Sequence, residues 1–177
     1  MGVPARRGAG ALTASPLRLA VLADTHLRAD LRPLPPEVWA TVAGCHAVLH
    51  AGDVVTADLL AALGEGRPVH AVLGNNDHAL VGRLPSRLEL ELAGVRVAMV
   101  HDAGARGGRA RRLRRWFPRA DVVVFGHSHE PVDEEAEGIL LLNPGSAVQR
   151  RRQPRRTMCV LELADGAVVG HRIVPLS

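Results

Sequence analysis

Short apolar segments separated by helical patterns constrain the fold of this chain more than any other feature. Residues 19–23, 47–50 and 69–73 are apolar runs that predict strands, and each is followed by Gly, Asp or Asn. Residues 36–44 and 57–64 lie between these runs and predict helices, with Leu, Val and Trp spaced on one side. Strands that alternate with helices favour βαβ units and a largely parallel sheet.

The second half of the chain follows a different pattern. Residues 87–92 alternate strictly between Leu and charged side chains, and Ala93-Gly94 forms a two-residue turn into residues 95–100, so a hairpin is predicted. Residues 108–117 predict an amphipathic helix that carries arginine outside one apolar seam. Two sheets with helices outside fit this order better than one open sheet. Further strands are expected at 121–125, 139–142, 157–163 and 167–174, the last two joined at Asp165-Gly166.

Length and composition indicate one globular domain. A chain of 177 residues can bury about 70% of its unfolded surface, so residues 18–177 are expected to form the domain and residues 1–17 a flexible N-terminal tail. The 47% hydrophobic content excludes a disordered protein. No apolar run approaches the ~18 residues of a membrane span. Cys45 and Cys159 are expected to be small buried side chains in a cytoplasmic protein.

Arginine is concentrated in two segments. The chain has 22 Arg, no Lys and 18 acidic residues, for a net charge of +4. Residues 106–119 hold seven Arg and residues 150–156 hold five, with no acid in either, so these segments carry +12 and the remainder −8. This asymmetry suggests an anionic ligand near the basic segments. A solvated helix face is favoured for the first segment, whereas a role near the site and a solvated surface are both open for the second.

Side chains that can bind metals follow nearly every predicted strand. The carboxyl ends of parallel strands gather at one edge of a sheet, so these side chains are expected to converge. Seven oxygen and nitrogen donors without a thiolate are too many for one ion and suit two ions that share a carboxylate. Such a set favours Mn, Fe, Zn, Ni or Co, and two such ions can clamp the oxygens of a phosphoryl transfer. The seven are Asp24, His26, Asp53, Asn75, His101, His127 and His129.

The chain contains the motif series DxH, GD, GNxD, H and GHxH, followed by Asn143-Pro144-Gly145-Ser146. This series resembles that of the calcineurin-like metallophosphoesterase superfamily and its small single-domain phosphodiesterase branch. The resemblance runs from about Arg18 to the C-terminus. It implies an α/β fold, a four-layer α/β/β/α sandwich of two mixed sheets. It also implies that one metal is held by Asp24, His26 and His129, that the other is held by Asn75, His101 and His127, and that Asp53 bridges them.

The function implied is a dimetal phosphohydrolase, most simply a phosphodiesterase in which a hydroxide bridging two divalent metal ions attacks phosphorus. Manganese is expected first among the candidate metals, and Asp53, Asn75 and His101 are the expected catalytic residues. Asn76 stands where larger members of the superfamily carry a His, and an amide cannot act as a general acid. The substrate-binding residues are expected to be Asn76, Ser146 and Arg150.

Two other functions stay open beside the enzyme. One is a non-catalytic scaffold on the same fold, although a scaffold is free to lose ligands and all seven positions here are competent. The other is an RNA-binding protein that uses the arginine segments, but two Trp, two Phe and no Tyr supply no stacking platform. Nucleic acid is therefore expected only as a substrate, and a homo-oligomer is expected by analogy with the branch.

The remaining histidines and Asp102 are not expected to be metal ligands. His50 is expected beneath the site. Asp102 either orients His101 or begins a loop. Surface or partly buried positions are expected for His46, His70, His78 and His171.

Overall fold

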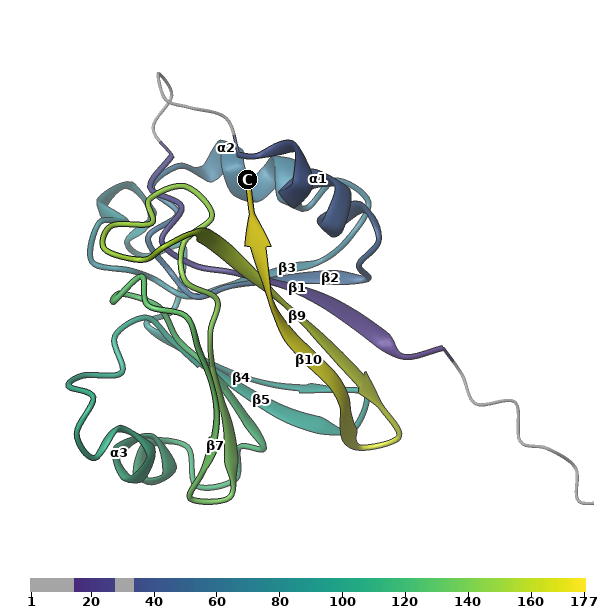
Figure 1. Cartoon of the computed structure of the whole chain (residues 1–177), viewed down its shortest axis with the longest axis vertical. Helices are drawn as coiled ribbons and strands as arrows, with labels where there is room; N and C mark the ends of the chain where they lie inside the picture. The colour runs from purple at the N-terminus through teal and green to yellow at the C-terminus, as the bar shows by residue number, and fades with distance from the viewer. Residues whose placement is uncertain (1–14, 28–33) are drawn as a thin grey trace, which may run out of the picture.

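The computed structural model describes residues 15–27 and 34–177, which form two five-stranded sheets (Figure 1). The first sheet has the order β10-β9-β1-β2-β3, with β1, β2 and β3 parallel and β9 antiparallel to both its neighbours. Its strands are β1 (Leu17–Leu22), β2 (Ala47–His50), β3 (Val69–Ala71), β9 (Arg156–Ala164) and β10 (Ala167–Leu176).

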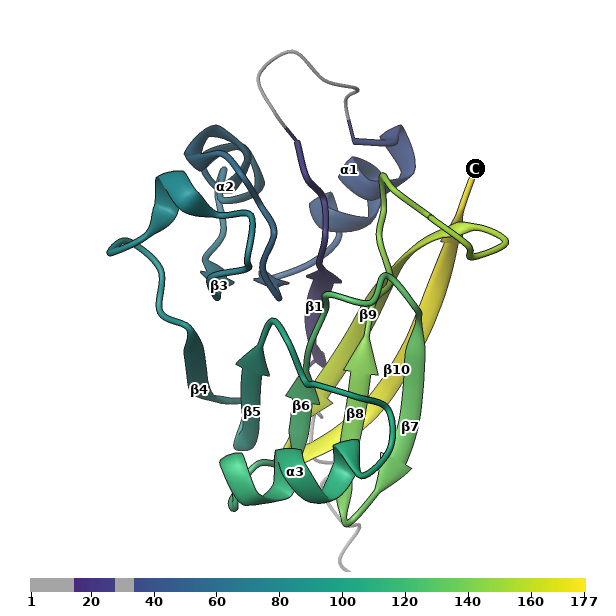
Figure 2. The ribbon, with the colours of Figure 1, turned by 90° about the vertical axis from the view of Figure 1, so that its left-hand side faces the viewer.

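The second sheet has the order β4-β5-β6-β8-β7, with three parallel strands in its centre and an antiparallel strand at each edge. Figure 2 shows this sheet facing the viewer. Its strands are β4 (Arg87–Leu92), β5 (Val95–Val100), β6 (Val122–Val124), β7 (Val132–Ala136) and β8 (Ile139–Asn143).

Three apolar layers hold four layers of structure together. Side chains of both sheets meet in the central core, which includes Leu161 and Met99. Helices α1 (Pro36–Ala43) and α2 (Ala57–Leu63) cover the outer face of the first sheet. Helix α3 (Arg109–Trp116) covers the outer face of the second through the fully buried Leu113. The predicted four-layer α/β/β/α sandwich of two mixed sheets is confirmed.

The two predicted hairpin turns are present. Ala93 and Gly94 have φ values of 49° and 78°, and Asp165 and Gly166 have 49° and 77°, which is the pair of left-handed residues that a type I′ turn requires. The amide of Gly166 donates to the carbonyl oxygen of Ala93 at 2.8 Å, so the tips of the two hairpins meet.

The structure differs from the predicted elements in two places. Strand β7 was not predicted, because its sequence VDEEA is mostly acidic and lacks apolar alternation. It is an edge strand, where charged residues are common. A short 3-10 helix, η1 (His78–Leu80), follows β3. Of the tail predicted at residues 1–17, residues 1–14 lie outside the described residues, whereas Leu17 is the first residue of β1.

The arginines around α3 act mainly within the protein. Arg112 and Arg114 donate to backbone carbonyl oxygens of neighbouring loops. Arg106 and Arg111 form exposed ion pairs with glutamates, and Arg109 lies over the ring of Phe125. The favoured expectation was a solvated face, and the structure shows in addition that several of these arginines hold neighbouring loops. In the described part of the chain, no helix is long and apolar enough to cross a bilayer.

Candidate metal centre

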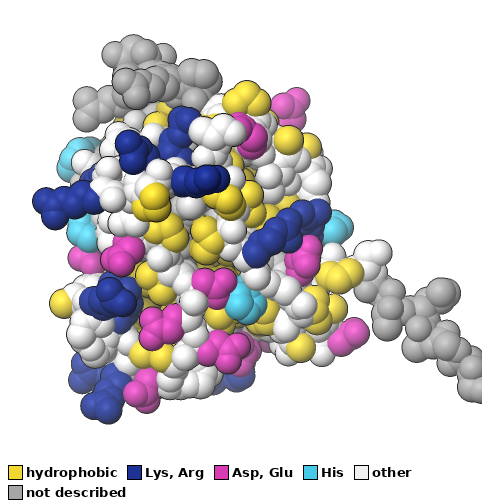
Figure 3. All heavy atoms as spheres, in the orientation of Figure 1, with side chains coloured by type: hydrophobic (Ala, Val, Ile, Leu, Met, Phe, Trp, Pro, Cys, Tyr) yellow, Lys and Arg dark blue, Asp and Glu magenta, His cyan; other side chains and the backbone are white. Residues whose placement is uncertain are grey.

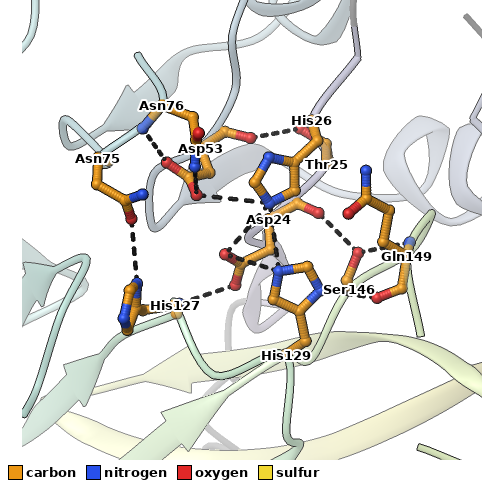
Figure 4. A network of polar contacts seen from close by, with 12 residues as sticks. Asp24, Thr25, His26, Asp53, Asn75, Asn76, His127, His129, Ser146 and Gln149 are labelled. Atoms are coloured by element: carbon orange, nitrogen blue, oxygen red, sulfur yellow. Dashed lines mark hydrogen bonds and ion pairs between the residues drawn. The ribbon is translucent and has the colours of Figure 1, made fainter. Parts of the chain in front are cut away.

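The site forms where β1 and β2 of one sheet and β5 and β6 of the other end. The loops that follow these strands are hydrogen-bonded to one another: Asp24 N donates to Gly52 O at 3.0 Å, and Gly126 N donates to His101 O at 2.9 Å. His101 Nδ1 contacts Ala51 O at 2.7 Å and so connects the two sheets. Figure 4 shows side chains from these loops pointing toward a common centre.

The first ligand cluster consists of Asp24, His26 and His129. The Nε2 atoms of His26 and His129 lie 3.2 Å apart. Asp24 Oδ1 lies 3.8 Å from the first nitrogen and 3.4 Å from the second. Asp24 and His129 are buried, and His26 is partly exposed. These three side chains have the mutual spacing of ligands to one ion.

The second cluster consists of Asn75, His101 and His127. Asn75 Oδ1 lies 3.0 Å from His101 Nε2 and 3.1 Å from His127 Nδ1. Asn75 and His127 are exposed, whereas His101 is buried, so this side of the site is open to solvent. One amide oxygen and two imidazole nitrogens therefore converge here.

Asp53 lies between the two clusters. Its Oδ2 atom is 3.4 Å from His26 Nε2 and 3.5 Å from His101 Nε2. All seven residues predicted as metal ligands are thus brought together, and the carboxylate predicted to bridge two ions occupies the position between both sets.

Backbone carbonyls orient two of the imidazoles. His101 Nδ1 lies 2.7 Å from Ala51 O, and His129 Nδ1 lies 2.7 Å from Gln149 O. A carbonyl oxygen can only accept, so Nδ1 carries the hydrogen in each ring. The lone pair of Nε2 then faces the site, which is the arrangement that metal-binding histidines usually adopt.

Much of the site is built on left-handed backbone. Asp24, His26, Asp53, His127 and His129 have φ values of 53°, 48°, 57°, 70° and 57°. Such values are uncommon for residues other than glycine and cost about 1–3 kcal/mol each when the conformation is strained. Five of the seven predicted ligands share this feature, and such backbone conformations are typical of functional sites.

Two glycines are required by close approach. A Cβ on Gly74 would lie 2.2 Å from Asp53 N and 2.3 Å from Asp53 Oδ1, and a Cβ on Gly126 would lie 2.9 Å from Asp24 Oδ2. Any side chain at either position would displace a predicted ligand.

Burial and charge shift the pKa values of the site. Burial raises the pKa of Asp24 to about 7 against the lowering effect of His101. Burial also raises the pKa of Asp53, but His101 and the Asn76 hydrogen bonds outweigh it and hold that pKa below its ordinary value. Burial lowers the pKa of His26, and it lowers the pKa of His129 to about 4. At neutral pH these two imidazoles are therefore uncharged and able to bind a metal.

The pKa of His101 shifts in the opposite direction from those of His26 and His129. Burial lowers the pKa of His101, but Asp53, the Ala51 carbonyl and Asp24 together raise it above its ordinary value. Below neutral pH, protons are therefore held mainly at Asp24 and His101, and the lone pair of His101 Nε2 becomes free once the ring loses its second proton.

The donor set fits divalent cations. Asp24 Oδ1 is buried without a hydrogen-bond partner in the described part of the structure, although three imidazoles surround it within 4.0 Å. A buried carboxylate oxygen without a partner is costly, and a cation among Asp24, His26 and His129 would satisfy it. The mixed oxygen and nitrogen donors suit Mn, Fe, Zn, Ni or Co.

All three predicted substrate-binding residues have hydrogen-bond partners within the protein. Ser146 is 1% exposed, and its hydroxyl donates to Asp24 O at 2.6 Å. A buried hydroxyl whose hydrogen is already donated supports the Asp24 turn and does not face a substrate, which corrects that prediction. Arg150 is exposed, but its Nη1 donates to Gln153 O at 2.9 Å, within its own turn. Asn76 donates its side-chain amide to Asp53 Oδ2 at 2.7 Å.

Asp77 was not among the predicted site residues, yet this buried carboxylate holds two of the ligand loops. Its Oδ2 accepts from Asp53 N at 2.9 Å and from Gly74 N at 2.7 Å, and its Oδ1 accepts from Val55 N at 2.6 Å. Val55 has a φ of 78°, a severe strain for a β-branched residue. Asp77 closes the GNxD motif, and that position was the only available sequence signal.

Two further buried residues support the site from beneath. His50 is fully buried, and its Nε2 lies 3.1 Å from Thr25 Oγ1, which in turn lies 3.3 Å from Asp53 O. Burial lowers the pKa of His50 to about 3, so it is neutral, as expected of a residue packed beneath the site. Asn143 donates to Gly126 O at 3.0 Å and so holds the loop before His127.

The other polar residues lie away from the ligand clusters. His46 Nδ1 accepts from Arg18 N, and His171 pairs with Asp133 on the surface. His78 is exposed at the start of η1. Asp102 Oδ1 accepts from Gly104 N at 2.7 Å, so of its two proposed roles it takes the loop role.

Comparison with known proteins agrees with the fold and indicates the family. The sequence model described as the calcineurin-like phosphoesterase superfamily domain matches residues 17–166. A protein of Methanothermobacter thermautotrophicus named probable metallophosphoesterase is 33% identical over 159 residues, which cover 88% of this chain and 91% of that protein.

Two solved structures share the arrangement of strands. Vacuolar protein sorting 29 from Cryptosporidium parvum has a TM-score of 0.75 at 18% identity and covers 93% of this chain and 100% of its own. A structure described as a novel archaeal phosphodiesterase has a TM-score of 0.67 at 20% identity, with 90% and 99% covered. At these identities the likeness establishes the fold alone.

Proposed function

The chain belongs to the calcineurin-like phosphoesterase superfamily, and from that premise we propose that it is a phosphodiesterase that uses two divalent metal ions. The observation that carries this proposal is the position of Asp53 Oδ2, 3.4 Å from His26 Nε2 and 3.5 Å from His101 Nε2. One carboxylate oxygen between two ligand clusters is the geometry of a shared ligand. Manganese is the first candidate, followed by Fe, Zn, Ni and Co.

Asp24, His26 and His129 hold one ion in this proposal, and Asn75, His101 and His127 hold the other. Two ions bound here would polarise the ester oxygens and lower the pKa of a water molecule. The chain supplies the rest through Nδ1–H groups that are fixed on carbonyl oxygens. These hydrogen bonds keep His101 Nε2 and His129 Nε2 directed at the site.

The described residues around Asp53 suggest which substrates react fastest. Asn76 lies against Asp53 through two hydrogen bonds, from its backbone N at 2.8 Å and from its side-chain amide at 2.7 Å. An amide donates a hydrogen bond but cannot transfer a proton to a leaving alkoxide. Within the proposed phosphodiesterase activity, esters with good leaving groups are therefore expected to react fastest.

A non-catalytic scaffold is the second candidate function. It is favoured by the likeness of the fold to vacuolar protein sorting 29, whose name places it in protein sorting. The seven potential ligands and their strained loops favour the enzyme, because a surface used only for binding another protein requires neither.

A panel of metals and substrates tests the proposal. Purified protein is stripped of metal, reloaded separately with Mn²⁺, Fe²⁺, Zn²⁺, Ni²⁺ or Co²⁺, and assayed with bis-p-nitrophenyl phosphate, p-nitrophenyl phosphate, cyclic nucleotides and a dinucleotide. We expect hydrolysis of bis-p-nitrophenyl phosphate that requires metal and disappears in His129→Ala. Binding of two ions without hydrolysis of any ester would favour the scaffold.

A further inference from the structure

The loop between β8 and β9 lies directly against the first ligand cluster. Gln149 O accepts from His129 Nδ1 at 2.7 Å, and Gln149 N donates to Ser146 Oγ at 2.9 Å. Figure 4 shows Gln149 beside Ser146 and His129 at this edge of the site. Position 149 is therefore fixed relative to the ligands, and the arginine run begins at the next residue.

A tight turn then determines which arginine remains available. Gln153 N donates to Arg150 O at 2.8 Å, and Arg150 Nη1 donates back to Gln153 O at 2.9 Å. The side chain of Arg150 is thus engaged by its own turn. Arg151 has a φ of 50°, left-handed backbone that is uncommon for arginine. Its exposed side chain makes no hydrogen bond or ion pair within the described ranges.

Arg151 lies two residues beyond Gln149, whose carbonyl oxygen is 2.7 Å from His129 Nδ1. Its Cα is therefore at most about 7.6 Å from the Cα of the residue that contacts this ligand. An exposed guanidinium this near the ligand loop, with no ion pair among residues 15–27 and 34–177, is suited to an anion that approaches the site.

The basic surface continues beyond this residue. A cavity of about 330 Å³ beside the same loop is lined by Arg150, Arg155 and Arg156, together with Leu176 and Ser177. Arg156 donates to the carbonyl oxygen of Ser177, and Arg155 is exposed. Figure 3 shows arginine side chains gathered over this end of the molecule.

We propose that Arg151 is the residue that determines substrate class, by binding a second anionic group on a substrate whose scissile phosphate lies at the ligand clusters. The preferred substrates are then phosphodiesters that carry a further phosphate, such as a nucleotide 5′-diester with a phosphate on its 3′ oxygen. This inference rests on the proposed function for the position of the scissile phosphate. A planar guanidinium can bind two oxygens of the second phosphate at once.

Equilibrium binding tests the inference independently of catalysis. The dissociation constants of thymidine 3′,5′-bisphosphate and thymidine 5′-monophosphate are measured by calorimetry on the Mn²⁺-loaded protein at fixed ionic strength. The bisphosphate should bind native protein about tenfold more tightly or better, as a charge-assisted hydrogen bond allows. Arg151→Ala should lose that preference and leave the affinity for the monophosphate within about twofold.

Arg119→Ala is the matched control, because Arg119 is an exposed arginine in the other basic segment and its loss changes the net charge equally. It should keep the preference for the bisphosphate. Equal affinities of the native protein for both nucleotides, or the same loss in Arg119→Ala as in Arg151→Ala, would overturn the inference.

Hydrolysis separates this inference from the proposed function. The p-nitrophenyl ester of thymidine 5′-phosphate is compared with the same ester that carries a 3′-phosphate. Arg151→Ala should raise KM for the second ester about tenfold and leave kcat unchanged. A native protein that binds the bisphosphate preferentially but hydrolyses neither ester would refute the proposed function while supporting the role of Arg151.

Discussion

His26 and His129 lie 103 positions apart in the sequence, yet their Nε2 atoms are 3.2 Å apart and their rings are stacked with centroids separated by 5.2 Å. Because Gln149 O takes the Nδ1–H of His129, the lone pair of its Nε2 points toward His26 and Asp24. Two imidazole nitrogens beside a carboxylate oxygen that has no hydrogen-bond partner among the described residues form a candidate cation site.

Replacing Asp53 by Asn should remove activity and bound metal together. The change removes a negative charge and one oxygen donor from the carboxylate between the clusters. The loss in metal affinity should exceed the roughly 10–100-fold that outer partners of metal ligands contribute. Metal content by mass spectrometry and hydrolysis of bis-p-nitrophenyl phosphate check this, with the exposed Asp58→Asn as control. Two bound metals with near-normal turnover in Asp53→Asn would rule out the bridge.

Asp77→Asn should loosen two ligand loops without removing a ligand. Asp77 accepts three backbone hydrogen bonds, and an amide has one acceptor oxygen where the carboxylate has two. We expect a loss of about 1–3 kcal/mol in unfolding free energy from the unsatisfied amide, measured by urea denaturation of the metal-free protein. Affinity for Mn²⁺ should fall about 10–100-fold.

Asp102→Asn provides the comparison for Asp77, because Asp102 accepts a backbone hydrogen bond in an exposed turn. It should change neither stability nor metal affinity appreciably. If Asp77→Asn behaved in the same way, Asp77 would not be needed to hold the loops.

Metal binding should release protons at mildly acidic pH. Burial raises the pKa of Asp24 to about 7, and the pKa of His101 is also raised despite its burial, so both groups hold protons below neutral pH. A cation must displace them, and affinity for Mn²⁺ should therefore weaken as pH falls below about 7.

Calorimetry in two buffers with different ionisation enthalpies counts the protons. At pH 6.5 we expect release of about one proton or more per chain, and less at pH 8.5. No proton release at the lower pH would contradict the raised pKa values of Asp24 and His101 in the metal-free protein.

The rate of hydrolysis should depend steeply on the leaving group. Asn76 cannot protonate a leaving alkoxide, and a general acid is worth roughly 10²–10⁴-fold. Aryl diesters should therefore react much faster than alkyl diesters in a series of graded leaving-group pKa. Asn76→His should flatten this dependence if the imidazole reaches the leaving oxygen.

His78 is the control for that series, since it is an exposed histidine two positions from Asn76. A shallow dependence in the native enzyme that became steep in His78→Ala would assign the general acid to His78. A shallow dependence unchanged by either substitution would indicate that the leaving group needs no protein acid.

The fold was predictable where local pattern determines structure. Strict alternation in residues 87–92 and the turn at Ala93-Gly94 fixed the β4–β5 hairpin, and the register from Arg87–Val100 to Leu92–Val95 agrees. Strand β7 was not predicted because three of its five residues are acidic and its pairing with β8 depends on tertiary structure. The family predicted from the motif series is confirmed.

The metal ligands of the site could be predicted from the sequence, whereas the roles of the residues around them could not. Asp24 and His129 follow apolar strands, so their convergence could be inferred from the sheet. The role of Ser146 could not, because sequence does not reveal that its hydroxyl donates to Asp24 O. The same holds for Arg150 and Arg151, since the turn that engages the first and leaves the second exposed depends on backbone conformation.

The number of metal ions required for hydrolysis tests the central claim most directly. Metal-stripped protein is titrated with Mn²⁺ from zero to four equivalents while cleavage of bis-p-nitrophenyl phosphate is measured. If two ions share Asp53, activity should depend on the second equivalent of Mn²⁺ and should reach its plateau at two ions per chain. Full activity at one equivalent, or no hydrolysis with two ions bound, would contradict this account.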